Sequence, residues 1–414
     1  MAMSIDVNPE ILVWARETAG LDVEDAAAKL QLTTSAKSTA VEKLEALESG
    51  EKQPTRNQLT AMANVYRRPL LAFYMAEPPQ TGPRGTDFRQ SPDTRGARSN
   101  AMLDALLRDV RARQETVRDM LGDEDDFQPL EFVGSIRMAQ GIDHAVASIS
   151  RVLGFDPSAP RRGDAGALFK QLREAAELVG IFVLVLGDLG SHHSAIPASV
   201  FRGFAIADHI APFVVINAKD ARPARAFTLI HELTHIWLGQ TGVSGTISTD
   251  SPRTTNARVE RFCNDVAGEF LLPGEQFKRG VAAFGRGDVE AARVAIEAIA
   301  ARWSVSEPMV AYRLNRTGDL TGDAYTSLRA EYAARWQAKL AKDRESEGQG
   351  PNPRVMKQFY LGNALVGVVH RYVRDNALSH TKAAALLGAK PGAVEPLLRQ
   401  FEAKRGSFVS KFGV

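Results

Sequence analysis

Apolar residues recur at helical spacing through most of the chain, and interruptions of that pattern divide it into four segments. In residues 1–80 the pattern predicts a bundle of short helices joined by tight turns. Gly20 ends the first helix, Asp22 is positioned to cap the second, and Gly50 and Pro54 separate two more. Short helices with such turns are typical of helix-turn-helix modules.

The second segment, residues 81–165, is predicted to be a connector. It starts with a Pro- and Gly-rich stretch and continues as a charged helix at residues 100–121. Residues 166–340 then alternate helical and strand patterns, and the apolar run PFVVIN at residues 212–217 predicts a buried strand.

The fourth segment, residues 354–414, is again helical and follows a polar linker at residues 342–353. The four segments together predict an α+β fold: a mainly helical, multidomain chain with one small sheet in its third segment.

Composition places the chain among ordinary globular proteins. Its 414 residues are 44% hydrophobic and 24% charged, with a net charge of +2. The single cysteine, Cys263, excludes an internal disulfide framework. The first residues lack the pattern of a secretory signal, and no apolar run approaches the ~20 residues of a membrane helix. We therefore expect a cytoplasmic protein that has no membrane partner.

Charge is distributed unevenly between the two helical ends. Residues 1–80 carry a net charge of −3, whereas residues 354–414 carry +7. The N-terminal pattern resembles the small Cro/repressor-type DNA-binding domains, but an acidic module is poorly suited to phosphate contacts. Two interpretations stay open for each end: contact with DNA, or docking onto a protein (a partner for the N-terminal module, a second copy for the basic tail).

The chemistry is concentrated in AFTLIHELTHIWLG, which contains His231, Glu232 and His235. Asp220 and Pro223 predict the start of a helix, and Gly239 predicts its end. On that helix the two histidines lie one turn apart on one face, as two imidazoles that bind a single Zn²⁺ must. Glu232 lies about 100° around the helix, where it can take a proton from metal-bound water.

A catalytic zinc ion has three protein ligands, so a third is required. The next predicted helix, at about residues 256–272, offers Glu260, and Asn264 follows one turn later on the same face. We expect Glu260 to bind the metal and the Asn264 amide to support a histidine ring. Asp265 is the alternative ligand.

The segments FTLIHELTHIWLG and VERFCNDVAGEFLLP, together with PFVVIN and the Arg-x-Phe-Thr run at residues 225–228, resemble the ImmA/IrrE family of metallopeptidases. The repressor-like N-terminal domain and the Asp-Phe-Arg run at residues 87–89 are similar to its long, fused members. The resemblance implies a gluzincin-like fold and a strand before the metal helix that pairs with an extended substrate. Here that strand comprises Phe213, Val214, Val215 and Ile216.

The resemblance also implies a role. Family members cut a partner repressor and so switch on stress, mobile-element or defence genes, and other long members resemble antitoxins of toxin–antitoxin modules. The first hypothesis is therefore a regulatory zinc endopeptidase that cleaves a specific protein partner, a transcriptional repressor or a cognate toxin. The alternative is a DNA-binding regulator or antitoxin whose metal site is structural or unused.

Two features of the predicted site remain open. An oxyanion donor is needed, and Tyr312, Arg313 or the histidines in GSHHS at residues 190–194 could supply one. Cys263 lies one turn from Glu260, so its thiolate could cap the metal. A small buried hydrophobic side chain is the favoured interpretation of that residue.

Overall fold

The computed structural model describes most of the chain, namely residues 7–35, 38–79, 86–87, 97–124, 127–161, 163–189, 194–244, 254–274, 277, 285–345 and 353–405. The chain divides into two compact units. The first comprises Met1–Arg84, Ser91–Arg111 and Ser191–Ile196, and the second comprises Gly85–Gln90, Ala112–Gly190 and Pro197–Val414.

The N-terminal unit contains the short helices that the sequence predicts. The Asp22 side chain accepts a hydrogen bond from the backbone N–H of Asp25 and so caps the second helix, as predicted. Gly20 and Gly50 follow helices with φ values of +67° and +79°, a conformation that glycine adopts without strain. The helices are α1 (Pro9–Glu17), α2 (Val23–Lys29), α3 (Ala40–Glu48), α4 (Arg56–Tyr66) and the 3₁₀ turn η1 (Leu70–Tyr74).

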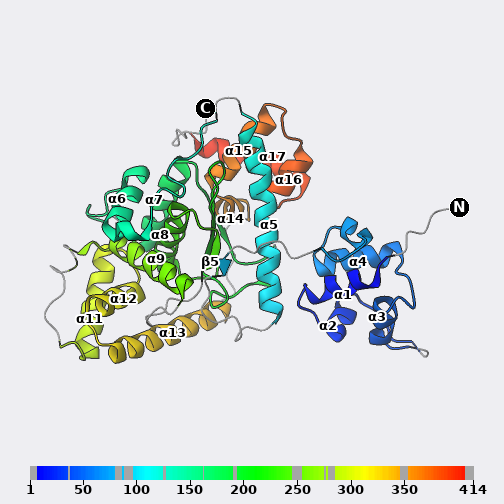
Figure 1. Ribbon diagram of the computed structural model, residues 1–414, viewed down its shortest axis with the longest axis horizontal. Helices are drawn as coiled ribbons and strands as arrows, with labels where there is room; N and C mark the ends of the chain where they lie inside the picture. The colour runs from blue at the N-terminus through cyan, green and yellow to red at the C-terminus, as the bar shows by residue number, and fades with distance from the viewer. Residues whose placement is uncertain are drawn as a thin grey trace. The chain divides into compact units, whose positions relative to one another are not determined.

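A mixed sheet forms the centre of the second unit (Figure 1). Its strands are β1 (Thr86–Asp87), β2 (Phe182–Leu186), β3 (Gly203–Ile206), β4 (Phe213–Asn217) and β5 (Gly242–Ser244), in the spatial order β1-β5-β3-β4-β2. The β1–β5 and β2–β4 pairs are parallel, and β3 is antiparallel to both of its neighbours. A small sheet among many helices confirms the α+β prediction.

Helices cover this sheet and extend beyond it. Helix α8 packs against β3, β4 and α9, while α7 and α14 pack against β2. Figure 1 shows α6 to α9 grouped beside the sheet, in green. The helices are α5 (Ala97–Gly122, which contributes to both units), η2 (Met138–Gln140), α6 (Ile142–Leu153), α7 (Ala165–Leu178), η4 (Arg222–Ala224), α8 (Arg225–Trp237), α9 (Thr255–Leu271), α11 (Val289–Trp303), α12 (Glu307–Thr317), α13 (Gly322–Glu345), α14 (Pro353–Leu361), α15 (Asn363–Arg374), α16 (His380–Leu387) and α17 (Pro391–Arg405). None of the helices in the described part of the chain is both long and apolar enough to cross a membrane.

The second unit is larger than the predicted segment of residues 166–340. Ala145, Ile149 and Leu153 of α6 are buried in the same core as β2 and α8, so the predicted connector supplies part of that core. The amphipathic pattern of α6 explains this, because one apolar face of the helix needs a partner.

The C-terminal helices also belong to this unit rather than to a separate domain. Arg173 and Glu177 of α7 form a buried ion pair, with 3.1 Å between Nε and Oε1. Arg173 also donates to the carbonyl of Phe359, and Glu177 accepts from the backbone N–H of Asn363. Gly362, with φ +80°, lies against the pair, where a Cβ would come within 2.2 Å of Glu177 Oε1. These contacts hold α14 and α15 to α7.

Candidate metal centre

Two adjacent helices bring the predicted metal ligands together. His231 and His235 lie one turn apart on α8, and Glu260 faces them from α9. The histidine Nε2 atoms are 3.2 Å apart, and Glu260 Oε1 lies 3.1 Å from Nε2 of His235. All three side chains are buried. Their ligand atoms are close enough together to hold one metal ion, which is the arrangement that the sequence predicts.

The start of α8 differs slightly from the prediction. The helix begins at Arg225, after a 3₁₀ turn that contains Pro223. Asp220 lies before that turn and accepts from the backbone N–H of Ala221 rather than capping the helix. The end of the helix is close to the predicted place, because Gly239 follows it with φ +69°.

A hydrogen bond outside the cluster fixes the His231 ring. Nδ1 of His231 lies 2.9 Å from Oδ1 of Asn264, so its N–H donates to the amide and Nε2 is left to face the cluster. This is the contact predicted for Asn264. The side chain of Gln240 lies beside the His235 ring. Such contacts hold a ligand in the tautomer and orientation that metal binding requires.

Glu232 lies beside the cluster with its side chain fully buried. Neither of its carboxylate oxygens has a hydrogen-bond partner that meets normal geometry. Burial is the main reason that its pKa rises to about 8, and Glu260 adds to the effect while His231 and the Ser244 hydroxyl oppose it. A carboxylate in this condition is suited to exchange a proton with a small molecule at the cluster.

The pKa of the Glu260 carboxyl group shifts in the opposite direction. Burial alone would raise the pKa of Glu260, but His231 and His235 outweigh it and lower that pKa to about 2. Glu260 is therefore a carboxylate at neutral pH. A negatively charged oxygen and two imidazole nitrogens form a donor set that suits zinc.

Space for Glu232 comes from a glycine in the adjacent strand. A Cβ on Gly203 of β3 would lie 2.6 Å from Oε1 of Glu232 and 2.9 Å from Cγ2 of Thr228. Glycine within a strand often marks a close approach by another group, so the run FRGFAI carries this signal, although only weakly.

Replacing Gly203 with alanine should displace Glu232 without removing a metal ligand. We expect the variant to bind zinc like the wild type and to cleave substrate about a hundredfold more slowly, because small displacements of reacting groups are costly. Zinc content and cleavage rate measured on one preparation test this. Gly322→Ala is the control, since a Cβ there has nothing within 4 Å. Equal rates for the two variants would contradict the assignment.

Tyr312 and Arg313 were named as possible oxyanion donors, but in the structure both bind acidic side chains. The Tyr312 hydroxyl donates to Asp265 Oδ1 at 2.8 Å, and Arg313 pairs with Glu269 at 2.5 Å. Arg316 binds Asp265 as well, so this alternative ligand is not part of the cluster. These contacts join α12 to α9 and thereby support the helix that carries Glu260.

The predicted substrate strand is also placed differently. β4 lies inside the sheet, with β2 paired to one edge and β3 to the other, and Phe213, Val214, Val215 and Ile216 are fully buried. An extended substrate therefore cannot pair with this strand, and the prediction is wrong. Sheet order depends on contacts between distant segments, which a strand pattern alone does not report.

Cys263 is buried with Val259 and Leu238, in agreement with its interpretation as a small hydrophobic side chain. Burial raises the pKa of its thiol well above the usual range, which disfavours the thiolate needed to bind a metal. Two predicted features lie outside the described residues: the histidines of GSHHS at positions 192 and 193, and residues 88–89 of the Asp-Phe-Arg run.

The sequence analysis missed one polar side chain at the cluster. Ser244 ends β5 and is buried, and its hydroxyl lies 3.1 Å from Nε2 of His231 and 3.4 Å from Nε2 of His235. In the sequence it is one of many small residues in a loop rich in glycine, serine and threonine, so nothing distinguishes it there.

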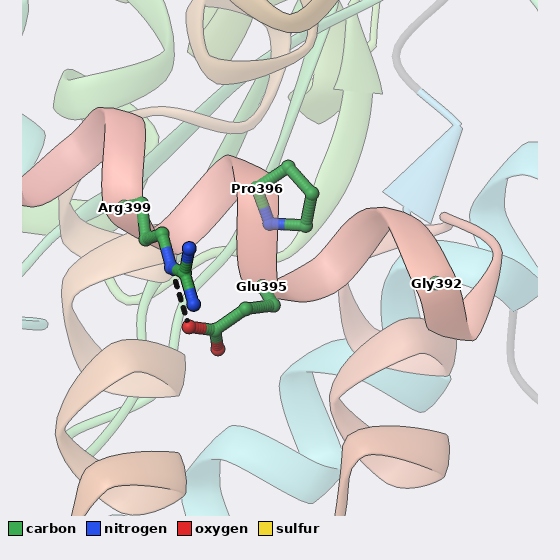
Figure 2. Close-up of a pocket in the computed structure, with 4 residues that line it drawn as sticks. All are labelled: Gly392, Glu395, Pro396 and Arg399. Atoms are coloured by element: carbon green, nitrogen blue, oxygen red, sulfur yellow. Dashed lines mark hydrogen bonds and ion pairs between the residues drawn. The ribbon is translucent and has the colours of Figure 1, made fainter.

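A separate pocket lies on α17, far along the chain from the cluster residues. Gly392, Glu395, Pro396 and Arg399 line it. Figure 2 shows the Glu395 and Arg399 side chains directed toward each other, and they form an ion pair at 2.8 Å. Arg371 of α15 likewise pairs with Glu124. Glu124 lies outside residues 354–414 and offsets part of the net positive charge of that segment, whereas Glu395 is already included in the net charge of +7. DNA contact there stays a prediction.

Comparison with known proteins supports the assignment of the central region. Neither a curated protein nor a solved structure matches the chain. A model of a peptidase family, described as the IrrE N-terminal-like domain, matches residues 191–315. That range includes α8, α9 and all three ligands of the cluster. This protein thus carries an IrrE N-terminal-like domain of the ImmA/IrrE type.

Proposed function

We propose that this protein is a zinc-dependent endopeptidase that cleaves a specific protein partner. The observation that carries the proposal is the buried, unpartnered carboxylate of Glu232 beside the cluster of His231, His235 and Glu260. A purely structural metal site has four protein ligands and does not need a buried, reactive carboxylate beside them. The peptidase-family match over the same residues supports the same conclusion.

The roles of the residues follow from their chemistry. His231, His235 and Glu260 would hold the ion, and Asn264 would keep the His231 ring oriented. A zinc ion there would supply positive charge, which lowers the pKa of water and of Glu232 and polarises the scissile carbonyl. Glu232 would take a proton from the water as the water oxygen bonds to the scissile carbonyl carbon, and it would deliver that proton to the leaving amine as the C–N bond breaks.

The proposed substrate is a transcriptional repressor, and the proposed setting is a stress, mobile-element or defence response. The family resemblance supports this, as does the acidic N-terminal unit of short helices, which suits docking onto a protein. Cells that express the wild type or Glu232→Gln, compared by mass spectrometry of protein N-termini, test the proposal. We expect one or a few new N-termini, in a DNA-binding protein, only with the wild type. Identical N-termini in both would contradict it.

A DNA-binding regulator or antitoxin is the second candidate. The observation that favours it is the net charge of +7 in residues 354–414, where Lys382 and Lys390 are exposed. Binding of the full chain to duplex DNA, weakened steeply by salt, together with no cleavage that depends on Glu232, would favour this candidate over the peptidase.

A further inference from the structure

The Ser244 hydroxyl contacts both histidines of the cluster. Its hydroxyl oxygen and the Nε2 atoms of His231 and His235 form a triangle with sides of 3.1, 3.4 and 3.2 Å. Glu260 Oε1 lies 3.1 Å from one corner of that triangle, at His235. The Ser244 hydroxyl therefore lies beside the two histidines of the three-residue cluster.

These distances match those of a four-coordinate zinc site. Ligands held about 2.0–2.1 Å from the ion at tetrahedral angles are separated from one another by roughly 3.3 Å. The separations observed between Ser244 and the two histidines lie within a few tenths of an ångström of that value. Catalytic sites normally leave this fourth position to water or substrate.

The backbone holds Ser244 firmly in this place. Ser244 is paired with Gly203 in the β3–β5 ladder, and its carbonyl accepts from the N–H of Arg202 at 3.2 Å. On the other side of β5, Gly242 and Val243 are paired with β1. The strand that presents the hydroxyl is thus bonded along both edges, and the side chain is only 2% exposed.

We propose that the Ser244 hydroxyl is the fourth donor to a metal ion bound by His231, His235 and Glu260, so that the resting site is closed. The inference rests on the proposed metal site. A neutral hydroxyl donates a lone pair without losing its proton and is a weaker ligand than the other three, so substrate or water can replace it. Cleavage then requires the Ser244 hydroxyl to turn away from the ion, while β5 keeps its pairing with β1 and β3.

Cobalt(II) binding to the purified, metal-free full chain tests this proposal without an activity assay. Co²⁺ has visible absorption bands that report coordination, and Zn²⁺ affinity follows by competition. We expect Ser244→Ala to weaken zinc binding about tenfold, as loss of a supporting group at a metal site does. We also expect the cobalt-loaded variant to bind acetohydroxamate, an external ligand, more tightly than the wild type does.

Ser244→Cys provides a second readout that does not depend on lost affinity. A sulfur at this position should bind the ion as thiolate, tighten zinc binding and give the cobalt protein an intense near-ultraviolet sulfur-to-metal band. Ser148→Ala is the control, because the Ser148 hydroxyl accepts a hydrogen bond from Trp237 but does not contact the cluster.

The possible outcomes separate this inference from the proposed function. Ser244→Ala could have the zinc affinity and cobalt spectrum of the wild type, and Ser244→Cys could give no sulfur-to-metal band. That result would overturn the role of Ser244 and leave the metal site intact. Failure of the wild type itself to bind cobalt or zinc would overturn the metal site, and the inference with it.

Discussion

Replacing Glu232 with glutamine should reduce cleavage by about 10²–10⁴-fold while leaving metal binding unchanged. The amide keeps the size of the side chain but cannot accept the proton. Because Glu232 is buried and not part of the ligand cluster, the three ligands keep their places. The rate with an identified substrate and the zinc affinity of the same sample together test this expectation.

The combination of these two readouts is what makes the Glu232 variant informative. Loss of cleavage with full zinc occupancy assigns Glu232 to proton transfer. Loss of zinc as well would place Glu232 among the ligands instead. Cleavage at the wild-type rate would contradict the peptidase mechanism. Glu174→Gln is a suitable control, since that carboxylate lies on α7 and pairs with Lys170.

The second large effect is expected on stability, at the buried pair that joins α7 to the C-terminal helices. Glu177→Ala should destabilise the fold by about 3–5 kcal/mol, because it leaves Arg173 as a buried charge without its carboxylate. Arg173 and Glu177 are 6% and 4% exposed, so water cannot replace the lost contact. Burial already lowers the pKa of Arg173 and raises that of Glu177, which shows how strongly this site disfavours charge.

Urea and thermal unfolding of the full chain measure this effect. Glu174→Ala, one turn away on α7 and partly exposed, is the matched control, and it should change stability by less than about 1 kcal/mol. Gly362→Ala should also lower the stability of the fold, since its Cβ would collide with the same ion pair. Similar unfolding midpoints for Glu177→Ala and Glu174→Ala would show that the C-terminal helices do not depend on this contact.

The sequence predicted the parts of the site that depend on helical periodicity. His231 and His235 share a face because they are four residues apart, and Glu260 and Asn264 share another for the same reason. Because an α-helix has 3.6 residues per turn, residues four apart share a face whatever the rest of the fold is, so the sequence alone predicts these positions. The pairing of α8 with α9 then completes the cluster.

The features that were missed depend on contacts between distant segments. The strand at residues 213–217 was correctly predicted, but its interior place in the sheet depends on β2 and β3. Tyr312 was named as one possible oxyanion donor, and its spacing does not reveal that its hydroxyl donates to Asp265. The position of Ser244 follows from its pairing with Gly203, and this cross-strand register is not visible in a loop of small residues.

The zinc content of purified wild-type protein beside Glu260→Ala, measured by elemental mass spectrometry, tests the central claim most directly. Glu269→Gln is the control, because Glu269 lies on the same helix but pairs with Arg313. We expect about one zinc ion per chain in the wild type and the control, and little in Glu260→Ala. A wild type that holds no zinc after supplementation, or equal zinc in Glu260→Ala, would contradict the account.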